Sequence, residues 1–133
     1  MGQSLLDALV EEELGSVVFV GDYLQLDFSH AVFTAYVWPI VTVGRRVLHF
    51  GDPGYRDGLC AFIGHEVAGV KESPETGLVI EFGLGEIVTS PRSAELDGPE
   101  IALLHLHEDS FRDKAWDVWR VGETPFEALA ASE

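Results

Sequence analysis

Hydrophobic and polar residues alternate with a period of two over much of this chain, and the alternation predicts a protein built mainly from β-strands. In the first half, the predicted strands span residues 16–20, 23–28 and 32–38, which together form an antiparallel meander. The third is apolar on both alternating faces, so we expect a central or doubly covered strand and not a solvent-exposed edge. A further short strand is predicted over residues 47–50.

The second half of the chain carries the same kind of pattern. Strands are predicted over residues 65–71, 78–82 and 86–90, and two more over residues 101–107 and 116–121. Glycine-containing segments separate the first three, as expected for tight connections between neighbouring strands. The second half therefore also predicts an antiparallel meander.

An N-terminal helix is expected to begin at Ser4 and to end at Gly15. Its apolar stripe consists of Leu5, Leu6, Leu9, Val10 and Leu14. Glu11, Glu12 and Glu13 would lie in its last turn, where the helix dipole disfavours negative charge by some tenths of a kcal/mol. Either a nearby arginine compensates for this charge, or the triplet faces a partner, or it is a solvated surface.

A second, short helix is predicted between the two halves, over residues 55–63. Asp52 is expected to cap this helix, Pro53 suits its first turn, and Gly64 ends it. Cys60 lies among apolar neighbours in the same segment, where we expect a buried and unreactive thiol.

The two halves also repeat one sequence pattern. Residues 24–28 return as residues 78–82, 54 positions later, whereas the leading pair Leu14-Gly15 returns as Ile63-Gly64, 49 positions later. A loop about five residues longer in the second copy would account for this difference. Such repeats indicate that one supersecondary unit was copied to complete a core that it cannot close alone. The two copies span residues 14–38 and 63–91.

These elements predict one domain over residues 1–133, of the α+β class and dominated by antiparallel sheet. The two repeats are expected to be related by an approximate two-fold axis and to form a sandwich-like or partly closed barrel. A chain of 133 residues is long enough for a single hydrophobic core. No segment approaches the roughly 18 uncharged apolar residues of a membrane span.

The chain is strongly acidic, with 23 acidic and 8 basic side chains and a formal net charge of −15. This charge repels nucleic acid and anionic membranes, and it can speed encounter with a basic protein partner. Simple solubility is the alternative explanation. The acidic N-terminal segment lacks the basic region of a signal peptide, and a single cysteine excludes an internal disulfide. We therefore expect a cytoplasmic protein.

Two histidines, His105 and His107, are the first candidates for metal binding, because residues two apart lie on one face of a strand. Together with His49 they would offer imidazole nitrogen ligands. The spacing matches no characteristic metal motif, so a surface pair is the alternative, and no cofactor is predicted.

Residues for catalysis are incomplete. The sequence has no Gly-x-Ser-x-Gly nucleophile motif. Asp27 and Glu81 occupy equivalent positions of the repeats and would suit a carboxylate pair, but their apolar neighbours favour two separate solvent-facing residues. A non-catalytic protein is therefore favoured over an enzyme.

Aromatic residues with a polar tip are typical of interface hot spots. The chain has six such residues, three tyrosines and three tryptophans: Tyr23, Tyr36, Trp38, Tyr55, Trp116 and Trp119. Trp116 and Trp119 are three positions apart, so on a strand they point to opposite faces and one is expected to be exposed or covered by a partner. They are binding candidates, together with Glu11, Glu12 and Glu13.

Four segments carry a resemblance to a known group of proteins. They are Gly51-Asp52-Pro53-Gly54-Tyr55-Arg56-Asp57, Ile63-Gly64-x-x-Val67, Leu78-x-Ile80-x-Phe82 and Trp116-Asp117-Val118-Trp119. Over residues 14–121 the chain resembles small bacterial, many of them actinobacterial, proteins built from Ile-Gly-x-x-Val β-meanders. This group has no assigned activity, so the resemblance implies a β-meander fold and no catalytic residues.

Three functions remain open. The leading hypothesis is a non-catalytic binding module, of the immunity type or otherwise inhibitory, whose acidic surface meets a basic partner; the analogy to immunity proteins concerns size, charge and β content. A second is a small-ligand or metal-binding protein, with a pocket between the repeats near His49, His105 and His107. A third is a homodimer formed through an exposed strand edge.

Overall fold

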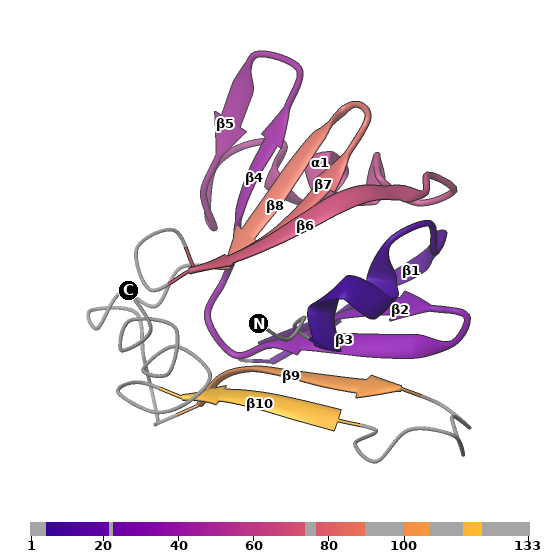
Figure 1. Cartoon of the computed structure of the whole chain (residues 1–133). Helices are drawn as coiled ribbons and strands as arrows, with labels where there is room; N and C mark the ends of the chain where they lie inside the picture. The colour runs from indigo at the N-terminus through magenta and orange to yellow at the C-terminus, as the bar shows by residue number, and fades with distance from the viewer. Residues whose placement is uncertain (1–4, 22, 74–76, 90–99, 107–115, 121–133) are drawn as a thin grey trace.

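Two antiparallel sheets make up the part of the chain that the structure describes. The computed structural model describes residues 5–21, 23–73, 77–89, 100–106 and 116–120, apart from the side chains of residues 5, 100–101 and 116–120. Ten strands form two sheets of five, and two short helices accompany them (Figure 1). The elements are η1 (Leu5–Leu9), β1 (Leu14–Val20), β2 (Tyr23–Phe28), β3 (Ala31–Ala35), β4 (Ile40–Val43), β5 (Arg46–Leu48), α1 (Tyr55–Cys60), β6 (Val67–Ser73), β7 (Gly77–Phe82), β8 (Gly85–Thr89), β9 (Glu100–Leu106) and β10 (Trp116–Arg120).

Each sheet combines strands from both halves of the chain. The order of the first sheet is β1-β2-β3-β9-β10, and that of the second is β5-β4-β8-β7-β6. The β4–β5 hairpin of the first half thus pairs with β8, and the β9–β10 hairpin of the second half pairs with β3. The described strands form a mainly antiparallel β fold, as predicted, but they close no barrel.

Each hairpin pairs with the meander of the other half of the chain, and this explains two differences from the predicted strands. The inner position of β3, between β2 and β9, was predicted, but β3 ends at Ala35 and not at residue 38. The chain leaves the first sheet there, and Pro39, which has no N–H to donate to a ladder, precedes the start of β4 in the second sheet at Ile40. The sequence pattern did not predict β4, because four residues carry too little periodicity.

The two meanders have matching registers. Phe28 pairs with Leu14 in the first meander, and Phe82, 54 positions later, pairs with Val67 in the second. Leu14 therefore corresponds to Val67 and not to Ile63, and a register shift follows the first pair in both meanders. The prediction of a second loop about five residues longer is wrong: three residues connect β6 with β7, and two connect β1 with β2.

A 3-10 helix over Leu5–Leu9, η1, replaces the α-helix expected to continue to Gly15. Glu11 has a φ of 74°, and its N–H donates to the carbonyl of Val67 at 2.8 Å. That N–H is therefore taken by β6 and does not extend the helix. The glutamate triplet, predicted for a last helical turn, lies instead in the connection between η1 and β1, with Glu11 in a turn.

The predicted second helix is present as α1, but it ends at Cys60. Its N-cap is Gly54, with no side-chain hydrogen bond, so Asp52 does not cap it. Gly58 faces Leu48 so closely that a Cβ there would lie 2.6 Å from the leucine Cδ1. Cys60 is exposed, contrary to prediction, because the short helix turns its other side to the sheet. No helix among the described residues is long and apolar enough to cross a membrane.

The first residues of β1 and β6 join the two sheets at one corner. Glu13 and Glu66 form an isolated antiparallel bridge there. Two matched pairs of backbone hydrogen bonds flank it: Glu11 N–H to Val67 O (2.8 Å) with Gly64 N–H to Leu14 O (2.8 Å), and Leu14 N–H to His65 O (3.0 Å) with Val67 N–H to Glu12 O (2.9 Å). Within each pair, the donor residues of the two hydrogen bonds are 53 positions apart, and so are the acceptor residues. The hydrogen bonds of this junction therefore have two-fold symmetry.

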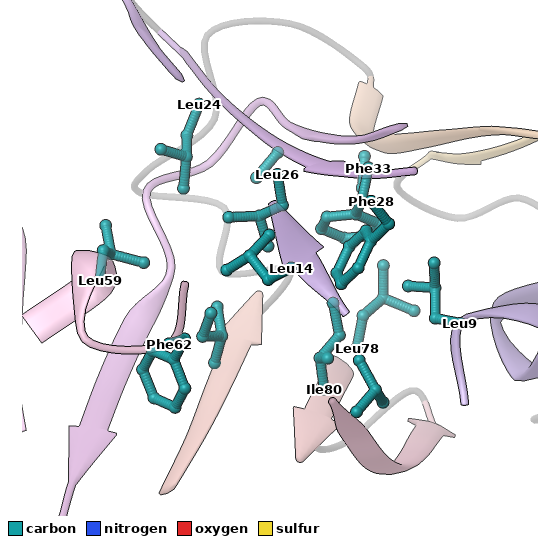
Figure 2. Close-up of a cluster of buried hydrophobic side chains, with 14 of the residues drawn as sticks. Leu9, Leu14, Leu24, Leu26, Phe28, Phe33, Leu59, Phe62, Leu78 and Ile80 are labelled. Carbon is teal, nitrogen blue, oxygen red and sulfur yellow. The ribbon is translucent and has the colours of Figure 1, made fainter. Parts of the chain in front are cut away.

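One hydrophobic core lies between the sheets (Figure 2). Its largest fully buried side chains come from both sheets, from η1 and from the α1 region: Leu6, Leu9, Leu14, Leu24, Leu26, Phe28, Phe33, Leu59, Phe62, Leu78 and Ile80. Burial of one such side chain stabilises the fold by about 1.5–3 kcal/mol. The hydrophobic side chains of both halves therefore depend on each other for burial.

Candidate functional site

A row of aromatic rings crosses the corner where β5 leads into α1. Phe19 of β1 stacks on Trp38 with ring centroids 6.3 Å apart, and Trp38 stacks on Phe50 at 4.3 Å and an interplanar angle of 16°. Phe50 makes a T-shaped contact with Tyr55 at 5.9 Å. Such ring pairs contribute about 0.5–1.5 kcal/mol each beyond burial. We call these four residues the aromatic row.

Both ends of the aromatic row, Tyr55 and Phe19, are anchored. The hydroxyl of Tyr55, which is buried, donates a hydrogen bond of 2.6 Å to the carbonyl of Pro39. The guanidinium of Arg56 lies 5.5 Å from the centroid of the Phe19 ring, within the range of a cation–π interaction. The rings are therefore held in place by contacts within the chain itself.

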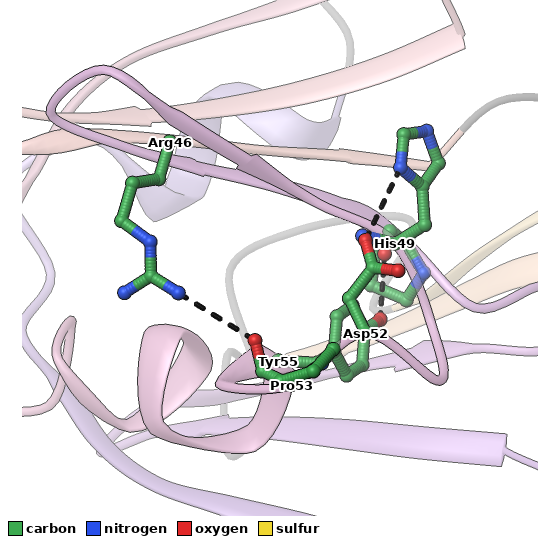
Figure 3. A network of polar contacts seen from close by, with 6 residues as sticks. Arg46, His49, Asp52, Pro53 and Tyr55 are labelled. Atoms are coloured by element: carbon green, nitrogen blue, oxygen red, sulfur yellow. Dashed lines mark hydrogen bonds and ion pairs between the residues drawn. The ribbon is translucent and has the colours of Figure 1, made fainter.

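Charged side chains in and next to the turn between β5 and α1 make polar contacts of their own (Figure 3). The carboxylate of Asp52 accepts a 2.8 Å hydrogen bond from the backbone N–H of His49, and its Oδ2 lies 3.7 Å from the imidazole Nδ1. Arg46 donates to the carbonyl of Pro53 at 3.5 Å. Gly54 has a φ of 87°, and a Cβ there would lie 2.7 Å from the Arg46 guanidinium. The turn conformation therefore requires glycine at this position.

A half-open pocket of about 260 Å³ lies at this turn. Its lining consists of Phe50, Gly51, Asp52, Gly54, Tyr55, Arg56 and Asp57. Phe50 is 52% exposed although its ring stacks on Trp38, and Val47 on the preceding strand is 55% exposed. Exposed apolar side chains beside a pocket with a few polar groups are typical of binding sites. This corner is the candidate functional site.

The glutamate triplet lies at the junction of the two sheets, between η1 and β1, and the Glu12 N–H donates to the carbonyl of Leu9 at the end of η1 (2.9 Å). Glu11 and Glu13 are exposed, and Glu13 faces Glu66 across the antiparallel bridge. Glu12 lies 3.3 Å from the imidazole of His30. Among the described residues no ion pair joins this triplet to a lysine or an arginine, so the compensating arginine considered from the sequence is not found there.

The structure does not bring the predicted histidine ligands together. His49 lies in the turn before α1, whereas His105 lies on β9 in the first sheet, where its exposed side chain alternates with the buried Leu104 and Leu106. His107 is outside the described residues. Within the described ranges, no three histidine, cysteine, aspartate or glutamate side chains form a group that could hold a metal ion.

The remaining candidates are also separated. Trp116 and Trp119 lie on β10 and pair with His105 and Ala102 of β9; their side chains are outside the described part. Asp27 is exposed on β2 of the first sheet. Glu81 lies on β7 of the second sheet, 3.2 Å from the ammonium of Lys71. The two carboxylates therefore belong to different sheets and form no catalytic pair.

Sequence reasoning missed Phe50, the central residue of the candidate site. The pattern assigned it to the end of a strand, whereas β5 ends at Leu48. The signal that could have identified it is its position directly before Gly51-Asp52-Pro53-Gly54, since a large apolar residue next to such a turn has no strand partner to cover it.

Comparison of the chain with protein-family models, with curated proteins and with solved structures found no match. The resemblance to actinobacterial β-meander proteins therefore stays a prediction.

Proposed function

We propose that this chain is a cytoplasmic, non-catalytic binding module that engages a basic protein partner, and that the corner between β5 and α1 is the surface it uses. The observation that carries the proposal is the half-exposed Phe50, stacked on Trp38 beside a pocket of about 260 Å³. Tryptophan, tyrosine and arginine dominate interface hot spots, and aromatic rings bury a large area with few rotatable bonds.

The rigidity of the aromatic row supports binding over a purely structural role. Trp38 and Tyr55 hold the Phe50 ring from two directions, so little conformational entropy would be lost when a partner covers it. A core role would predict a buried ring, yet about half of the side chain remains accessible. A partner that covers Phe50 and Val47 would remove both from water.

Charge supports a basic partner. The net charge of −15 attracts cationic proteins over a distance of about one Debye length, roughly 8–10 Å at physiological salt. Steering of this kind raises the association rate, whereas the short-range contacts at the corner determine how long the complex lasts. We therefore expect affinity to fall with salt and to depend on Phe50.

Capture from an extract of the source cells tests this proposal with two matched variants. Phe50→Ser removes the exposed ring, and Val18→Ser removes an exposed apolar side chain from β1. We expect the wild type and Val18→Ser to retain the same basic protein in near-stoichiometric amount, and Phe50→Ser to lose it. Equal retention by all three, or retention of nothing but further copies of the chain, would contradict the proposal.

We also infer that the two halves descend from one duplicated unit, a helix followed by three meander strands and a hairpin. The matched registers support this, as does the correspondence of η1 with α1: Leu9 and Phe62, 53 positions apart, are both fully buried. Independent support would come from related chains in which residues 5–35 and 58–89, the helix and the three meander strands of each half, align at the same offset of 53 or 54.

A further inference from the structure

We propose that the pocket beside Phe50 receives a cationic side chain, a guanidinium or an ammonium group, from the basic partner. This inference rests on the proposed function and assigns the chemistry that the pocket recognises. Its lining combines two aromatic rings, Phe50 and Tyr55, with the carboxylates of Asp52 and Asp57. Aromatic faces and carboxylates are the two kinds of group that bind such cations in proteins.

The aromatic side of the pocket has an open ring. Trp38 stacks on Phe50 nearly parallel, and Tyr55 meets it almost at a right angle, yet the side chain is 52% exposed. A cation is attracted to the face of such a ring, which is electron-rich, and not to its edge. The same row already holds one guanidinium, since Arg56 lies over Phe19. This internal contact is a second example of the interaction that we propose for the partner.

The charged side of the pocket also favours a cation. Both described contacts of Asp52, to the N–H and to the imidazole of His49, involve its Oδ2 atom, and they fix the carboxylate at the pocket. Asp57 is exposed in the first turn of α1. The opposing charge in the lining is that of Arg56, whose guanidinium is engaged on the Phe19 ring. The pocket lining therefore has two negatively charged side chains and one positively charged side chain, which already contacts the Phe19 ring.

Two further basic side chains lie near this turn. Arg46 is not in the pocket lining, but its guanidinium is directed to the Pro53 carbonyl and lies beside Gly54, which is in the lining. His49 lies against Asp52, and its side chain is 58% exposed. An incoming guanidinium, with five donors in a planar fork, could bond to the Asp52 and Asp57 carboxylates while it stacks on Phe50.

NMR titration of the 15N-labelled full chain tests the proposal with a defined probe, N-acetyl-arginine methylamide. The citrulline analogue, which has nearly the same shape and no charge, is the matched control. We expect the arginine probe to shift the amide signals of residues 50–57 in a saturable way. Citrulline should bind about tenfold more weakly, the effect of losing one charge-assisted hydrogen bond.

Three variants separate the pocket from general charge attraction. Asp52→Asn keeps an oxygen that can accept from His49, and Asp57→Asn keeps the size of the side chain; each should weaken the arginine probe about tenfold. Asp27→Asn makes the same change of charge on β2 and should leave binding unchanged. Equal weakening by all three, equal binding of citrulline, or shifts confined to other residues would each overturn the proposal.

The result is distinguishable from a failure of the proposed function. If the extract yields a basic partner that depends on Phe50 while the arginine probe does not bind residues 50–57, only the assignment of the pocket is wrong. If the probe binds as expected and no partner is retained, the pocket is a cation site and the binding-module proposal is wrong.

Discussion

The two halves of this molecule place different residues at corresponding positions of the same framework. Phe19 on β1 pairs with Leu24, and Glu72 on β6 pairs with Leu78, which corresponds to Leu24. Phe19 begins the aromatic row, whereas a glutamate stands at that position in the second half. The comparison teaches that the strand framework and the candidate site are separable: both halves have matching meander registers, but only the first half has an aromatic residue at the position of Phe19.

The largest expected effect concerns the shared core. Leu26 and Ile80 correspond to each other and are both buried between the sheets. Leu26→Ala and Ile80→Ala should each lower the free energy of unfolding by about 2–5 kcal/mol, because each leaves a cavity in the common core. Urea denaturation followed by tryptophan fluorescence measures both. A large loss in one variant and none in the other would show that the halves do not share one core.

A smaller effect is expected where the framework itself differs between the halves. Ala31 of β3 corresponds to Gly85 of β8, but a Cβ at Gly85 would overlap the backbone carbonyl of Thr42 on β4. Gly85→Ala should therefore destabilise the protein by about 2–3 kcal/mol, the cost of overpacking against backbone. Ala31→Gly is the matched control and should cost about 1 kcal/mol. An unchanged midpoint for Gly85→Ala would mean that β4 does not lie against β8 as described.

The smallest effect concerns the junction between the sheets. Glu11 and Gly64 correspond to each other, and both have a positive φ, 74° and 91°. Gly64→Ala should lose about 1–2 kcal/mol from backbone strain alone, since nothing lies within 4 Å of the added Cβ. Glu11→Gly should gain up to about 1 kcal/mol. Thermal denaturation of both variants checks the signs, and shifts in the same direction would contradict the shared junction.

Local patterns predicted most of the strands. The bounds predicted for residues 23–28 agree with β2, because alternation is regular there and turns lie on both sides. The ends of β3 and β5 were misplaced, since the chain changes sheets between them. The pairing of hairpins with meanders depends on contacts between residues more than 40 positions apart, such as Val41 with Ile87. No local sequence pattern encodes such contacts.

The candidate site was harder to predict for the same reason. The row unites Phe19, Trp38, Phe50 and Tyr55 from four separate segments, so their contacts exist only after the β4–β5 hairpin has paired with β8. The glutamate triplet shows a different error, in which a local pattern predicted a helix that the fold does not form. Helical spacing predicted a helix through Glu11, but hydrogen bonds to β6 outweigh the helical propensity of three glutamates.

The central proposal is that Phe50 binds a partner and that its loss leaves the chain folded. The most direct test is isothermal titration calorimetry of the captured partner against the wild type and Phe50→Ser, with urea denaturation of both chains. We predict an affinity loss of about 30-fold or more, the loss typical of a hot-spot residue, and a loss of about 1–3 kcal/mol in the free energy of unfolding, because two ring contacts disappear while the variant stays folded. Unchanged affinity, or a loss of affinity that is matched by unfolding of the variant, would contradict the account.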